Sequence, residues 1–195
     1  MPLKQYGVSM KVREIVKASA ELLNMKDVVK YLDGDIEESD EINESITNFV
    51  LAVNMVNNNI ASSYIDLIGE SNVYNNGDKV HYSDITSNNI IEIRNVYNVN
   101  GDNVDFKVMP DGLVLSSGDY KIVYSYYPES LTIDSKIDYY LKLNELTFAL
   151  GVVGEYLFIK GAVDDAYMWD KRFKNAMFNV LRPKKNIILP ARRWE

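Results

Sequence analysis

Apolar residues recur at spacings of three and four over residues 9–32, and this period predicts an amphipathic helix. Gly34 follows the last apolar position, where a glycine commonly ends a helix in the left-handed conformation. Ser39 or Asp40 is placed to begin a second helix over about 40–60, because acidic residues favour the first turn of a helix. We therefore expect the chain to open with two helices.

The period changes between residues 72 and 127, where apolar and polar residues alternate in short runs. Asn100-Gly101 is typical of a tight hairpin, and Pro110-Asp111-Gly112 marks another turn. The last run ends at Pro128 and places four large residues on one face, namely Tyr120, Ile122, Tyr124 and Tyr126. These features predict a small antiparallel β unit of about four to six strands.

Helical spacing returns at Ser135, and the apolar stripe contains Gly151 and Gly154. Each glycine inside a helix costs about 1 kcal/mol relative to alanine, so we expect a neighbouring element to pack closely there. Gly161 is expected to end this helix. A last helix then begins at Asp164 or Asp165 and stops at Pro183; its predicted buried stripe is Ala166, Trp169, Phe173, Ala176 or Met177, and Val180.

The order of these elements predicts an α+β fold. A mainly helical four-helix body is expected over 1–69 and 129–182, with an inserted small antiparallel β subdomain over 70–128. An extended C-terminal arm is expected over 183–195. The hydrophobic content of 47% is high enough for a packed core and argues against a disordered chain.

The arm has the composition of a docking segment. Pro183 and Pro190 oppose a helix, the apolar residues between them favour an extended strand, and the arginines suit carboxylates or phosphates. An extended apolar segment of this kind is stabilised by adding to a sheet edge or groove of another chain. The residues predicted to dock are Ile187, Ile188, Leu189, Arg192, Arg193 and Trp194.

Charge is distributed unevenly along the chain, whose formal net charge is −7. Residues 171–195 hold eight Lys or Arg and one Glu, a net charge of +7, so the other residues carry −14. Such asymmetry predicts that the basic end meets an acidic surface, either nucleic acid or a neighbouring subunit.

Candidate chemistry is sparse. The absence of cysteine excludes disulfides, thiolate catalysis and cysteine zinc sites. His81 is the single histidine, without a nucleophile motif, and the acidic stretch 33–41 has Glu38 where a calcium loop needs glycine. Tyr120, Tyr124, Tyr126 and Tyr127 are a possible stacking surface for bases or sugars, but half-buried sheet positions account for them better. We expect no catalytic, cofactor or metal site, and neither a signal peptide nor a membrane span.

Residues 145–195 resemble the C-terminal half of head-to-tail connector (neck or adaptor) proteins of tailed bacteriophages. The matching pieces are the small-residue helix ending in Glu155-Tyr156-Leu157, the stretch 167–173 (YMWDKRF) and the closing Leu189-Pro190-Ala191-Arg192-Arg193-Trp194. The strand at 119–128, DYKIVYSYYP, is also similar to the last strand of the inserted β unit in such proteins. Before residue 119 the likeness consists only of helix order and the position of the insertion.

The resemblance implies a non-enzymatic virion protein that forms a homo-oligomeric ring, commonly twelvefold, in the phage neck. Its partners would be the portal protein and tail or neck proteins, and it would assemble in the host cytoplasm. Genomic DNA would pass through the lumen without sequence-specific binding, and an acidic lumen would let it slide. Two other classes stay open: a nucleic-acid-binding module acting through the basic tail, and a hydrolase using the β unit.

Overall fold

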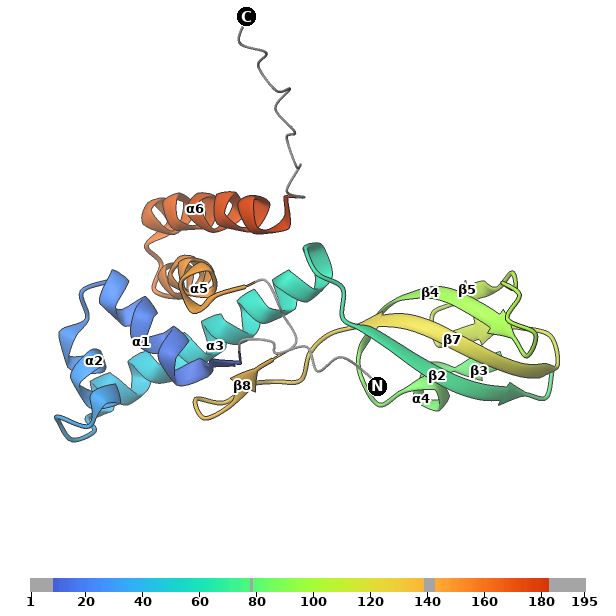
Figure 1. Cartoon of the computed structure of the whole chain (residues 1–195). Helices are drawn as coiled ribbons and strands as arrows, with labels where there is room; N and C mark the ends of the chain where they lie inside the picture. The colour runs from blue at the N-terminus through green and yellow to red at the C-terminus, as the bar shows by residue number, and fades with distance from the viewer. Residues whose placement is uncertain (1–8, 78, 139–142, 183–195) are drawn as a thin grey trace, which may run out of the picture.

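The computed structural model describes residues 9–77, 79–138 and 143–182 and has the predicted α+β fold. A helical body occupies one end of the molecule and a β unit the other (Figure 1). The body contains α1 (Val12–Leu22), α2 (Lys26–Asp33), α3 (Asp40–Ser63), α5 (Glu145–Ile159), α6 (Val163–Leu181), and the short strands β1 (Met10–Lys11) and β8 (Lys136–Ile137). The β unit contains β2 (Ile68–Asn75), β3 (Lys79–His81), α4 (Tyr82–Ile85), β4 (Ile90–Asn98), β5 (Lys107–Met109), β6 (Gly112–Val114) and β7 (Gly118–Tyr126).

The expected single helix over 9–32 is wrong, because the segment forms two helices, α1 and α2. Asn24 adopts a positive φ of 56°, a conformation that asparagine tolerates better than most residues, and it reverses the chain between them. The Met25 amide then donates to the Ala20 carbonyl at 2.9 Å. Because the chain turns here, both helices bury their apolar sides in one core.

The boundary between α2 and α3 lies where the sequence predicted it. Gly34 ends α2 in the left-handed conformation, with φ 86°. The Ser39 side chain accepts from the Ile42 amide at the start of α3. Further along α3, the Phe49 ring stacks on Tyr156 of α5 with ring centroids 4.0 Å apart, and both side chains are buried.

The helix predicted to start at Ser135 instead begins at Glu145, so the expected onset is wrong, and Lys136–Ile137 form the strand β8. Met10 of β1 pairs with Ile137 of β8, and both side chains are fully buried. The Asn144 side chain caps α5 by accepting from the Thr147 amide at 2.8 Å. The strand pair therefore joins the beginning of the described chain to the segment that returns from the β unit.

Close packing between α5 and α6 occurs at the two glycines, as the sequence predicted. A Cβ atom on Gly151 would lie 3.0 Å from the Phe173 ring and 3.0 Å from Val56. A Cβ on Gly154 would lie 3.3 Å from the Asp170 backbone nitrogen. The cost of glycine in a helix is thus offset by burial of Phe173, which is 2% exposed.

The β unit consists of two three-stranded antiparallel sheets, with strand orders β2-β7-β4 and β3-β6-β5. Its core lies between the sheets and includes Val96, Leu113 and Ile122, all fully buried. Tight turns occur at the predicted Gly101, with φ 84°, and at Gly112, where an added Cβ would lie 2.2 Å from the Val80 carbonyl oxygen. The alternation over 72–127 therefore encodes a small two-layer β structure.

A narrow connection joins the two parts. Leu67 is buried in the core of the body, and Tyr126 packs against the cores of both parts. The Asn54 amide group of α3 donates to the Leu131 carbonyl at 3.0 Å and accepts from the Leu131 amide at 2.7 Å. Arg94 and Asp66 form an ion pair across the same region, at 2.9 Å. These contacts fix both chain segments that connect the β unit to the body.

The glycine packing generates a stability prediction. Replacing Gly151 by Leu places a side chain where Phe173 and Val56 already lie, so the free energy of unfolding falls by about 1–3 kcal/mol. Asn175→Leu, on the exposed side of α6, adds a similar side chain without this clash and serves as the control. Thermal unfolding by circular dichroism measures both. Equal melting temperatures for the two variants contradict the packing account.

Candidate docking surfaces

The outer side of α6 carries apolar residues that the fold leaves uncovered. Ala166, Phe173 and Met177 pack inward, whereas Tyr167 is 62% and Phe178 65% exposed. Val163, Tyr167 and Phe178 are spaced by four and eleven residues, so they align on one side of the helix. We call these three residues the α6 flank.

The α6 flank extends onto the end of α5, because the Tyr167 ring meets Phe158 edge to face with centroids 5.3 Å apart. In Figure 1, α6 forms the outer layer of the body, and no other described element lies beyond it. Elsewhere on this helix Trp169, predicted to be buried, is only half-buried and has the Arg172 guanidinium 4.6 Å from its ring. The contact of α6 with α5 thus covers only some of the apolar side chains of α6.

The predicted docking residues Ile187, Ile188, Leu189, Arg192, Arg193 and Trp194 lie outside the described residues. Helix α6 ends at Leu181, and the Arg182 amide donates to the Phe178 carbonyl at 3.0 Å. The last described residue, Arg182, therefore lies one helical turn beyond Phe178 of the α6 flank.

Exposed carboxylates gather at the end of the body farthest from the β unit, in the loop between α2 and α3 (Figure 1). Asp33, the last residue of α2 beside this loop, pairs with Lys17 at 2.6 Å. Glu44 in α3 pairs with Lys160 at 2.6 Å, and the hydrogen bond from that ammonium lowers the pKa of Glu44. Within the described ranges, no group of three or more His, Cys, Asp or Glu could hold a metal ion.

His81 stands at the end of β3, and its side chain is exposed. Its backbone amide donates to the Asp84 carboxylate at 3.3 Å, which helps to begin the short helix α4. Of the tyrosines considered for stacking, Tyr120 and Tyr124 lie in β7 and are buried, at 7% and 6% exposed. Neither feature gathers catalytic groups in the described residues.

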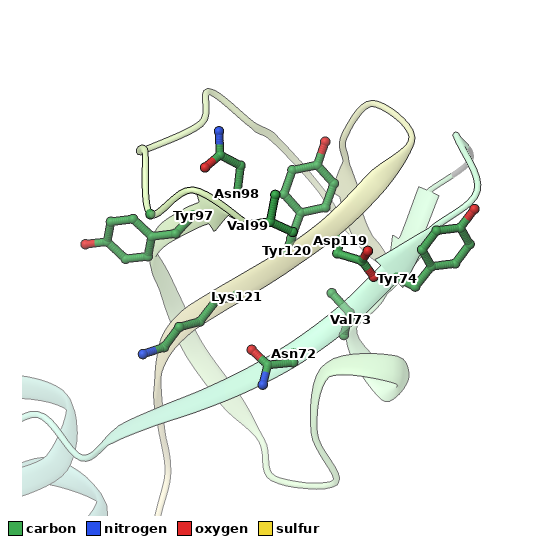
Figure 2. Close-up of a pocket in the computed structure, with 10 residues that line it drawn as sticks. Asn72, Val73, Tyr74, Tyr97, Asn98, Val99, Asp119, Tyr120 and Lys121 are labelled. Carbon is green, nitrogen blue, oxygen red and sulfur yellow. The ribbon is translucent and has the colours of Figure 1, made fainter.

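A shallow groove crosses the outer face of the β2-β7-β4 sheet near its free end (Figure 2). Its residues come from three strands, and we call it the β-unit groove: Asn72 and Tyr74 of β2, Asp119 and Lys121 of β7, Tyr97 of β4, and Val99 just after β4. In the sheet register Tyr74 faces Asp119, while Asn72 and Tyr97 face Lys121 from either side. The alternation of the sequence places these residues on the polar face, but it does not reveal that they surround one groove.

Comparison with models of known protein families finds no match, and no curated protein matches the chain. In the described part of the chain, no helix is both long enough and apolar enough to cross a lipid bilayer.

Glu155 of α5 is half-buried near Asp170 and Lys174 of α6, and it generates a pH prediction. Burial raises its pKa, the neighbouring Asp170 raises it further, and Lys174 partly offsets this. The folded protein therefore binds this proton more tightly than the unfolded chain, and the associated stability is lost as the pH rises through the raised pKa. Glu155→Gln is expected to raise the melting temperature at about pH 8 and to lose that advantage at about pH 4.

Calorimetry at the two pH values measures this difference, with Glu129→Gln in an exposed loop as the control. A Glu155→Gln protein that is less stable than the parent at about pH 8 would show that the carboxylate is favourably bound.

Proposed function

We propose that this protein is a head-to-tail connector of a tailed bacteriophage, a structural and non-enzymatic virion protein. Copies of the chain assemble into a ring, twelvefold in the family it resembles, between the portal and the tail. Genomic DNA passes through the lumen without sequence-specific contacts. The proposal rests on the resemblance of residues 145–195 together with the surfaces that follow.

The α6 flank is the observation that carries the proposal. A monomer that keeps Tyr167 and Phe178 62% and 65% exposed on one side of a helix has an apolar surface suited to another protein. Large aromatic side chains are also the residues that contribute most to protein interfaces. Arg182, the last described residue, donates its amide to the Phe178 carbonyl, so the arm predicted over 183–195 follows the Phe178 end of the α6 flank in the sequence. We assign this region to the contact between neighbouring subunits and to the portal.

The exposed carboxylates of the helical body favour a channel through which DNA passes and argue against a DNA-binding site. The loop between α2 and α3 exposes Asp35, Glu37 and Glu38, and the first turn of α3 exposes Asp40 and Glu41, without a basic residue among them. Like charge keeps a polyanion hydrated and mobile, whereas DNA-binding surfaces are basic. The β unit lies at the opposite end of the body, where it is free to contact a further neck or tail protein (Figure 1).

Substitutions in the α6 flank test the proposal. Changing both Tyr167 and Phe178 to Ser removes the apolar contact without touching the core, so the monomer folds but no longer joins rings on the portal. Val108→Ser, also at an exposed position but in the β unit, is the control and assembles normally. The measurements are the mass of complexes formed with purified portal and the protein content of particles. Normal incorporation of the double variant would contradict the proposal.

Removal of residues 183–195 tests the arm. We expect the thermal unfolding of the truncated monomer to stay nearly unchanged, while its incorporation into particles is lost. Particles that stay infectious with the truncated protein would disprove the docking role.

If the full chain instead retains DNA with an affinity that falls steeply with salt, and Arg192→Ala reduces that dependence, the protein is a nucleic-acid-binding module.

A further inference from the structure

The β-unit groove has an aromatic side chain at each end. Tyr74 is 70% exposed, and Tyr97 lies two strands away across β7. From the strand spacing and the two-residue offset in register, their Cα atoms lie about 12 Å apart. Figure 2 shows the two rings on opposite sides of β7, with Asp119 beside Tyr74 and Lys121 on the side of Tyr97. The groove therefore suits an elongated ligand that contacts both rings.

The floor between the rings offers both hydrogen-bond donors and acceptors. Within the described residues, the side chains of Asn72 and Asp119 make no hydrogen bond or ion pair, so both remain available to a ligand. Lys121 is paired with Glu70 at 2.7 Å, which neutralises its charge but leaves two of its three N–H donors. A ligand that both donates and accepts, as hydroxyl groups do, satisfies this floor.

Charge in the groove argues against an anionic ligand. The one cation, Lys121, already has a carboxylate partner, and Asp119 adds an uncompensated negative charge. Phosphates or nucleic acid would be repelled there. A protein partner fits less well, because charged residues are depleted at the centres of protein interfaces, whereas Asp119 and Lys121 occupy the centre of this groove.

We propose that the β-unit groove binds a neutral oligosaccharide. The C–H face of a sugar ring is apolar and carries a partial positive charge, so it stacks on the negative face of a tyrosine ring. Tyr74 and Tyr97 hold two sugar units in this way. Asp119 accepts hydrogen bonds from hydroxyl groups, and Asn72 and Lys121 donate to them. This binding site is separate from the α6 flank and does not depend on the proposed role in the neck.

Binding is tested with the full chain on an array of neutral glycans, followed by saturation-transfer NMR and calorimetry. The soluble probes are maltohexaose, cellohexaose and chitohexaose, with an alginate oligosaccharide as the anionic comparison. We expect saturable binding of at least one neutral glycan, with an affinity independent of salt because no charge is neutralised. Tyr74→Ala is expected to weaken this binding about tenfold, and Asp119→Asn to weaken it as well.

Val108→Ser changes an exposed residue on the other sheet and is expected to bind like the parent chain. The proposal is overturned if no neutral glycan binds, or if Tyr74→Ala and the parent bind equally. Preference for the alginate probe, with affinity rising in Asp119→Asn, would identify an anion site and also overturn it. Loss of particle incorporation in Tyr74→Ala without any glycan binding would overturn it in favour of a protein partner.

Discussion

The close approach of α5 and α6 is the constraint on which the arrangement of this protein depends. Gly151 and Gly154 remove the side chains that would hold the helices apart, and Phe173 fills the space beside Gly151. Helix α6 packs on α5 with one side, on which Ala166, Phe173 and Met177 are buried. The other side of α6 is consequently left outside the core, with Tyr167 and Phe178 on it. The same packing that stabilises the body thus leaves two large aromatic side chains of α6 exposed.

The β unit can be inserted into this body because both connections to it are fixed locally. Asn54 of α3 holds the returning chain through two hydrogen bonds to Leu131, and Leu67 anchors the outgoing chain in the core. The pairing of Met10 with Ile137 then leads the chain back toward α5. The β unit has its own core, so its outer face is free to carry a groove without affecting the helices.

Local signals in the sequence predicted local structure well. Gly34 and Ser39 act through their own backbone and side chain, and the alternation around Tyr124 follows directly from strand geometry. The break at Asn24 was missed because apolar spacing continues through it. The strand at Ile137 was missed because its partner, Met10, is distant in sequence and its spacing also fits a helix.

The candidate surfaces were less predictable than the fold. Phe178 and Tyr74 are exposed, and only the packing of α6 and the sheet register show which residues lie beside them. The docking residues predicted from the arm, such as Trp194, lie outside the described residues and stay a prediction.

The central claim is that the α6 flank is a contact between subunits in the phage neck. An electron cryomicroscopy reconstruction of the neck at side-chain resolution tests it most directly. The account predicts a ring of this chain below the portal, with Tyr167 and Phe178 buried against a neighbouring subunit or the portal. A ring in which both side chains face solvent, or a neck that lacks this protein, would contradict it.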